Sequence, residues 1–265
     1  MGLVDLTVLH SDPNSALSWE ILLKRYGSFT WTGIVPLTLF AYLLGHLLSF
    51  SSSVLVQKHA LWRHGHPAKF LIYGHSVKYL STDGGAAPRW SAVLRVLTFI
   101  LLWPISLLDT LFTVYIPLAK NYIRPFDKMV YDAIGSAFAE LWIRLGLSDE
   151  LTDTPPWSHN IEQLALHCSL EGAPVHLALM RNYVVLYGFL RSICLLLVVA
   201  CWVLLVHVIM SPSSLTVWIW LVSGVLVTFL SYTAFLKFWI RYHKDAMMAF
   251  VASFAKAGGI NQLDN

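Results

Sequence analysis

The chain has 265 residues, of which 57% are hydrophobic and only 12% are charged. Soluble domains carry roughly 25% charged residues, so the polar residues here are too few to cover a surface that faces water. The net charge of +3 is spread along the chain and not gathered in a tail, which excludes nucleic acid as an obvious partner. The composition therefore predicts an integral membrane protein with the lipid bilayer as its partner.

Residues 1–30 are expected to form an amphipathic lead-in and not a cleaved export signal. Asp5, Asp12 and Glu20 stand where a signal peptide needs positive charge. Trp19 and Tyr26 are residue types that anchor chains at the membrane surface. We expect this segment to lie in the headgroup layer before the chain enters the membrane.

Residues 31–118 are expected to form a first membrane pair around the basic 57–90 loop. The stretch Trp31–Val56 has no charge and is long enough to cross about 30 Å of hydrocarbon. The second stretch, Ser91–Leu118, has Pro104 near its centre, and proline kinks or breaks a helix. It forms either one kinked span or two half-helices that return to the same side, and the sequence leaves both open.

The C-terminal half predicts a transmembrane hairpin over residues 184–240, followed by a tail over residues 241–265. The apolar stretches Val184–Met210 and Leu215–Trp239 are joined by Ser-Pro-Ser-Ser. So short a connection forces the two helices to pair antiparallel. Together with the first pair, the sequence predicts an all-α bundle of four transmembrane helices, the second of them kinked or re-entrant.

Residues 119–183 are expected to form a helical region outside the membrane. Apolar residues recur at helical spacing between Phe126 and Leu145, which predicts an amphipathic helix. Its apolar stripe is expected to pack against another surface, either a soluble protein partner or the rest of the bundle. Four stripe residues are the candidates for binding such a partner: Met129, Ile134, Phe138 and Trp142.

The distribution of Lys and Arg predicts which loops face the cytoplasm. Four spans with both termini inside leave the five basic residues of the 57–90 loop outside. A re-entrant second stretch places both long loops and the tail inside. We favour four spans, because 28 residues are short for a membrane hairpin. Both arrangements predict an inner-membrane protein with a cytoplasmic C-terminus.

Polar residues within the apolar stretches are the candidate functional residues. An intramembrane carboxylate costs roughly 2.5–3.5 kcal/mol on insertion scales, so Asp109 is expected to face a partner or water. Arg191 and Arg95 are the candidate partners. His46 and His207 are expected to form interhelical hydrogen bonds. These residues line a pore or proton path in one interpretation and hold the bundle together in the other.

The chemistry of an enzyme or a metal site has little support in the sequence. His59, His64, His66 and His75 lie in one loop, but no cysteine or glutamate accompanies them. The sequence contains no phosphate loop, His-Glu-x-x-His, Gly-x-Ser-x-Gly or dinucleotide fingerprint. We therefore predict no catalytic residue, no metal and no cofactor.

Three short segments resemble a group of small, largely uncharacterised bacterial polytopic membrane proteins: Ala41–Ser49, Arg181-Asn182 and Arg241-Tyr242. The general layout is also similar to membrane components of antiviral defence systems. The resemblance implies a homo-oligomer that forms a pore or senses the membrane. Two alternatives stay open, a membrane anchor that recruits a soluble partner on its cytoplasmic face, and a metal-handling membrane protein or enzyme.

Overall fold

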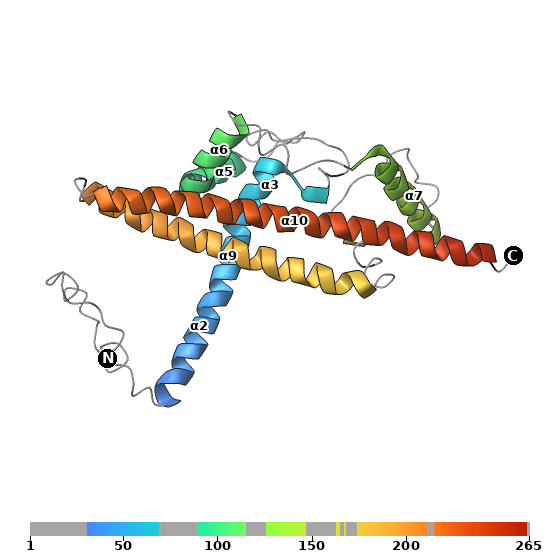
Figure 1. Cartoon of the computed structure of the whole chain (residues 1–265), viewed down its shortest axis with the longest axis horizontal. Helices are drawn as coiled ribbons and strands as arrows, with labels where there is room; N and C mark the ends of the chain where they lie inside the picture. Colours follow the sequence, from blue (N-terminus) through green and yellow to red (C-terminus); the bar gives the residue numbers. More distant parts are fainter. Residues whose placement is uncertain are drawn as a thin grey trace. The chain divides into compact units, whose positions relative to one another are not determined.

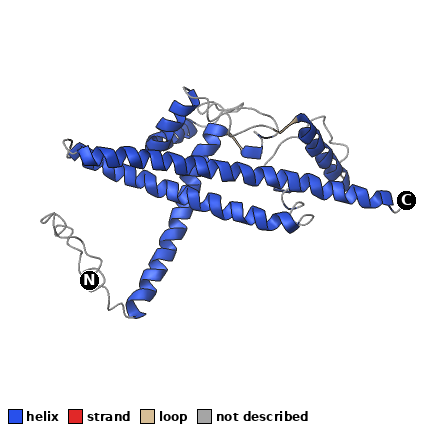
Figure 2. Cartoon of the chain, in the orientation of Figure 1, coloured by secondary structure: helices blue, strands red, loops and turns tan. Residues whose placement is uncertain are grey.

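The computed structural model describes residues 31–68, 71, 89–114, 126–146, 163–164, 167, 174–210, 212 and 215–263. Within these ranges every regular element is a helix (Figure 2). The elements are α2 (Trp31–Ser52), η2 (Ser53–Gln57), α3 (Lys58–His64), α5 (Arg89–Leu101), α6 (Trp103–Val114), α7 (Lys128–Arg144), α9 (Pro174–Met210) and α10 (Leu215–Leu263) (Figure 1). The chain divides into two units, residues 1–47 and 48–265. The predicted lead-in over residues 1–30 lies outside the described residues.

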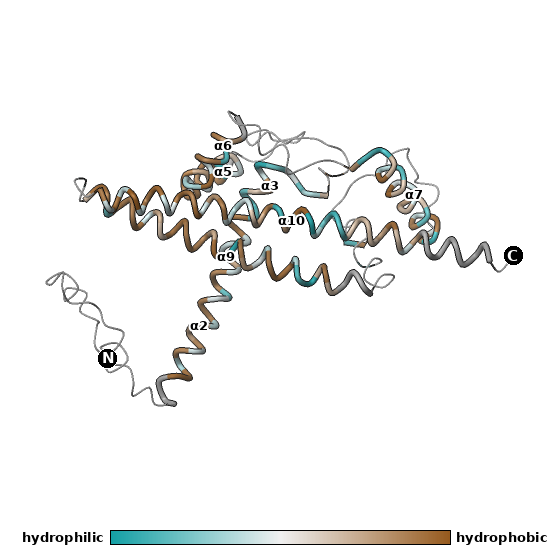
Figure 3. Tube along the Cα trace, viewed as in Figure 1, coloured by the Kyte–Doolittle hydropathy of each residue, from teal (hydrophilic) through white to brown (hydrophobic). Residues whose placement is uncertain are grey.

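Three helical stretches are long and apolar enough to cross a membrane, namely Ile34–His64, Ala178–Met210 and Leu215–Phe254 (Figure 3). A fourth crossing is counted if α5 and α6, which are bent by 93° at their junction, form one span. The predicted all-α class and the multi-pass membrane character are confirmed. The first apolar helix is longer than predicted, because it continues past Val56 through η2 and α3 to His64.

The helices α9 and α10 lie side by side as the predicted antiparallel hairpin (Figure 1). With 37 and 49 residues they measure about 55 and 73 Å, so both extend well beyond a hydrocarbon layer of about 30 Å. We call the side of the connection at residues 211–214 the closed end of the hairpin, and the opposite side its open end. The two helices approach closely at Gly224, where an added Cβ would lie 3.3 Å from the Cys201 sulfur.

The helix α7 packs against α10 near the open end of the hairpin. Phe138 of α7 and Phe250 of α10 contact each other with ring centroids 4.8 Å apart. Around them lies a small apolar cluster that also includes Ile134 and Met247. The Arg144 guanidinium stands 4.9 Å from the Phe254 ring. The chain therefore covers the apolar stripe of this amphipathic helix with its own α10.

The bend between α5 and α6 is explained by its backbone hydrogen bonds. Pro104 has no N–H to donate, and the N–H of Ile105 bonds to the Leu102 carbonyl instead of the Leu101 carbonyl. The carbonyl oxygen of Leu101, which a continuous α-helix would pair with Ile105, accepts a bond from the Trp202 indole N–H of α9 at 2.8 Å. Leu102 and Pro104 are buried. Irregular backbone at membrane depth is tolerated where it is buried in protein in this way.

The two ends of the α5–α6 pair lead to the same region of the hairpin. The backbone N–H of Phe126, which follows the pair, donates to the carbonyl of Leu71, which precedes it, at 3.0 Å. Ala68 also packs in the α7 cluster at the open end. With 13 and 12 residues, α5 and α6 are about 20 Å long, so each is too short to cross a bilayer alone. This arrangement favours a re-entrant pair over a single kinked span.

Candidate functional site

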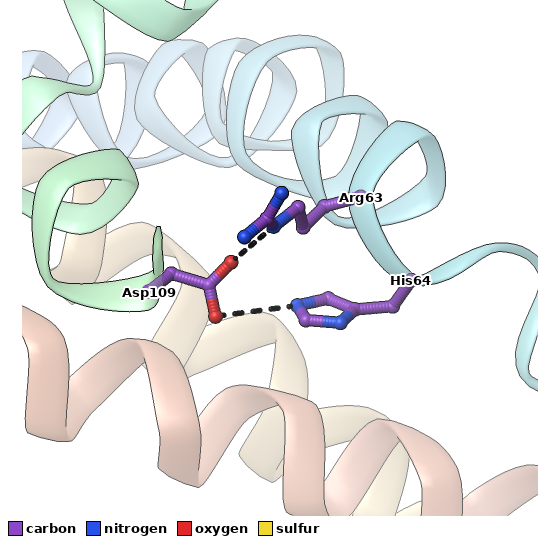
Figure 4. Close-up of polar contacts among 3 residues, drawn as sticks. All are labelled: Arg63, His64 and Asp109. Carbon is purple, nitrogen blue, oxygen red and sulfur yellow. Dashed lines mark hydrogen bonds and ion pairs between the residues drawn. The ribbon is translucent and has the colours of Figure 1, made fainter. Parts of the chain in front are cut away.

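Asp109 of α6 is buried and lies beside the end of α3 (Figure 4). The Arg63 Nε–H donates to Asp109 Oδ2 at 2.8 Å, and His64 Nε2 stands 3.7 Å from Oδ1. The ion-pair partner that the structure shows is therefore Arg63, where the sequence suggested Arg191 or Arg95. The physical reason is the added length of the first helix, because α3 carries two basic side chains into the bundle that were expected in a surface loop.

Arg191 of α9 forms a second polar cluster with the preceding part of the first helix. Its Nε–H donates to the Ser52 hydroxyl at 3.1 Å, and its Nη2 donates to the Ser49 carbonyl at 3.3 Å. Its Nη1 donates to the side-chain oxygen of Gln57. All three acceptors are neutral. Among the described residues, no carboxylate pairs with the positive charge of Arg191.

The π-helical turn η2 lies between these acceptors. A π turn shifts the backbone hydrogen bond from four to five residues and widens the helix locally. Ser52, immediately before the turn, and Gln57, at its end, both reach the Arg191 guanidinium. The carbonyl of Ser49 accepts from the Ser52 hydroxyl as well as from Arg191. Such turns occur frequently at functional sites. Here the turn η2 aligns the neutral acceptors of the Arg191 guanidinium.

Two further buried polar residues, His59 of α3 and Tyr232 of α10, lie near His64 of the first cluster. The Tyr232 ring centroid is 6.1 Å from that of His59 and 6.3 Å from that of His64. Buried polar side chains thus come from the first helix, α6, α9 and α10. We call this set the polar core, and its members are Ser52, Gln57, His59, Arg63, His64, Asp109, Arg191 and Tyr232.

The other three intramembrane candidates lie outside the polar core. The Arg95 guanidinium of α5 stands 5.7 Å from the ring centroid of Trp62 in α3. His46 contacts Tyr42, one turn earlier in the same helix, with ring centroids 4.4 Å apart. His207 is exposed on α9. The structure shows no interhelical hydrogen bond for either His46 or His207 among the described residues.

The four candidate partner-binding residues of α7 differ in burial. Ile134, Phe138 and Trp142 are buried within the chain, whereas Met129 is 85% exposed. The apolar stripe of α7 is therefore packed against the chain's own helix α10, which was one of the two alternatives. For metal binding, no group of three or more His, Cys, Asp or Glu side chains occurs in the part of the chain that is described. His75 lies outside that part.

Sequence reasoning missed Gln57, Arg63 and His64 as members of the site. The signal was present, because Lys58–His64 contains no glycine or proline and Gly65 is the first residue that can end the helix. Gly65 has a φ of 80°, a conformation that favours glycine. The basic residues Lys58 and Arg63 were taken to mark a loop, although a long helix can place a charged residue inside a bundle where a residue of opposite charge lies nearby.

These features define the class, an all-helical polytopic membrane protein with a polar core between its helices. Comparisons of the chain with protein-family models, with curated proteins and with solved structures find no match.

Proposed function

We propose that the protein is an oligomeric, pore-forming component of a bacterial inner membrane, in which the α5–α6 pair and the polar core line a path for protons or small ions. The observation that carries the proposal is the buried Asp109 carboxylate on a half-helix, paired with Arg63. Ionisable residues at membrane depth are costly and typically mark ion paths or proton relays. The proposed role in antiviral defence rests on the resemblance in layout alone.

Two polar atoms at the bend support this path. The hydroxyl of Ser106 and the indole N–H of Trp103 are buried, and within the described residues neither has a hydrogen-bond partner. Buried polar groups are nearly always paired, with protein or with water. Both residues precede Asp109 by two turns or less on α6. The polar lining of this half-helix therefore favours a hydrated route that ends at the carboxylate.

We also propose an orientation. A re-entrant pair puts the segment between α3 and α5, the 119–183 region and the tail on one side of the membrane. These segments are rich in Lys and Arg, and basic flanks are typical of the cytoplasmic side. The C-terminus is therefore proposed to lie in the cytoplasm.

The test is the ion flux through the purified full chain in liposomes, with Asp109→Asn as the variant. We expect the flux to fall by about tenfold or more, because the neutral amide leaves the Arg63 cation uncompensated in the path. Asp132→Asn is the matched control, because Asp132 is exposed on α7 and its side chain forms no ion pair among the described residues. Equal flux through all three proteins would contradict the proposal. So would a monomeric mass in detergent, since a self-assembled pore needs several copies.

A further inference from the structure

A cavity of about 480 Å³ lies at the open end of the hairpin, between the end of the first helix, α9 and α10. Its volume is in the range of small-molecule sites, about 300–1,000 Å³. The lining combines aromatic rings with a few polar groups, among them Gln57, His66, Tyr187, Trp239, Tyr242 and His243. This combination suits a ligand that has a polar group and an apolar part.

The cavity lies where the apolar part of the hairpin ends. Trp239 is the last residue of the long apolar stretch of α10, and the basic residues Arg241 and Lys244 follow it. Tryptophan and tyrosine are enriched at the level of lipid headgroups. Tyr187 and Tyr242 stand with ring centroids 5.9 Å apart at this level. A lipid headgroup is therefore a ligand that the bilayer itself delivers to this position.

The charges around the cavity favour an anion. The rings of His66 and His243 meet edge to face there, with centroids 5.3 Å apart. Among the described residues that line the cavity there is no carboxylate. Gln57 lines it and accepts a hydrogen bond from Arg191, whose acceptors are all neutral. A buried cation whose described partners are all neutral makes the neighbouring space favourable for a negative group.

We propose that this cavity binds the phosphate headgroup of an anionic phospholipid. The phosphate lies against the two imidazoles and Gln57, with Arg191 behind it as the source of positive potential. The glycerol and the first part of the acyl chains lie on the aromatic rings of α9 and α10. The proposal goes beyond ion conduction and does not depend on it.

The experiment measures binding of dioleoyl phosphatidylglycerol to the full chain by native mass spectrometry from a neutral detergent, with phosphatidylcholine as the reference lipid. We expect tighter binding of the anionic lipid. The double variant His66→Ala/His243→Ala is expected to weaken it about fivefold to tenfold. Ala246→Leu tests the cavity independently, because Ala246 lines it and a larger side chain fills part of the space. His207→Ala, an exposed histidine on α9, is the matched control.

Each result of this experiment supports or overturns the proposed lipid site. Weaker phosphatidylglycerol binding in both cavity variants, with the control unchanged, supports the site. Equal affinity for the two lipids, or unchanged binding in the cavity variants, overturns it. Inorganic phosphate is added as a competitor, and displacement of the lipid at millimolar phosphate would assign the site to the free anion and overturn the lipid as the ligand. Liposome flux is read separately, so failure of lipid binding leaves the conduction proposal to its own test.

Discussion

At the scale of single residues, the polar core contains two cations with different surroundings. Arg63 has a carboxylate partner at 2.8 Å, whereas Arg191 is held by three neutral acceptors from one stretch of helix. A guanidinium presents several donors in a fixed plane, which lets a single side chain satisfy acceptors on both sides of the π turn. The arrangement therefore depends on the shape of the group as well as on its charge.

The prediction for Arg191 follows from this shape. Arg191→Lys keeps the charge but cannot reach three acceptors in one plane, so we expect it to lower the free energy of unfolding by about 1–3 kcal/mol. Arg181→Lys on the same helix is the control, because Arg181 is exposed and its substitution is expected to cost less than about 0.5 kcal/mol. Denaturation in mild detergent measures both variants. Equal losses in the two variants would show that the planar contacts contribute nothing.

At the scale of elements, the bend of the α5–α6 pair depends on a bond from a neighbouring helix. Pro104 frees the backbone, and the Trp202 indole satisfies the Leu101 carbonyl that the helix leaves without its usual partner. Trp103 and Trp202 also contact edge to face, with ring centroids 6.4 Å apart. The bend is therefore stabilised by Trp202 of α9 as well as caused by Pro104.

Trp202→Phe tests this dependence because it keeps an aromatic ring and removes the N–H. We expect a loss of about 0.5–2 kcal/mol in stability, the range for a hydrogen bond within a membrane protein. Trp218→Phe removes a similar bond, to the Pro212 carbonyl at 3.2 Å near the closed end of the hairpin. The Trp218 side chain is exposed whereas that of Trp202 is half-buried, so water replaces the Trp218 bond more easily and we expect a smaller effect. A larger loss in Trp218→Phe than in Trp202→Phe would contradict this account of the bend.

At the scale of the whole molecule, the number of crossings depends on the α5–α6 pair. The bond between Leu71 and Phe126 joins the two flanks of the pair, so we expect both flanks on one side of the membrane. Three crossings then place the chain ends on opposite sides, whereas four crossings place them on the same side. The charge count agrees with three crossings, because all long basic segments share one side.

Labelling of single cysteines with a membrane-impermeant reagent tests this topology. In a chain whose Cys168, Cys194 and Cys201 are replaced by serine, one new cysteine is introduced at a time. The four positions are Ser11→Cys, Asp83→Cys, Asp127→Cys and Asn265→Cys. We expect positions 83, 127 and 265 to be labelled from one side and position 11 from the other. Labelling of positions 83 and 127 from opposite sides would show that the pair crosses the membrane.

The class of protein, the hairpin and the amphipathic helix were predictable from the amino-acid sequence, because apolar length, helical spacing and a four-residue connection are local properties. Only the tertiary structure decided which partner Asp109 has, since Arg63 is 46 positions away and the choice depends on which helix faces meet. It also decided that α10 covers α7, and that Trp202 supports the bend, because both contacts join distant segments. The end of the first helix at His64 could have been predicted from Gly65, but the basic residues before it were interpreted as a loop.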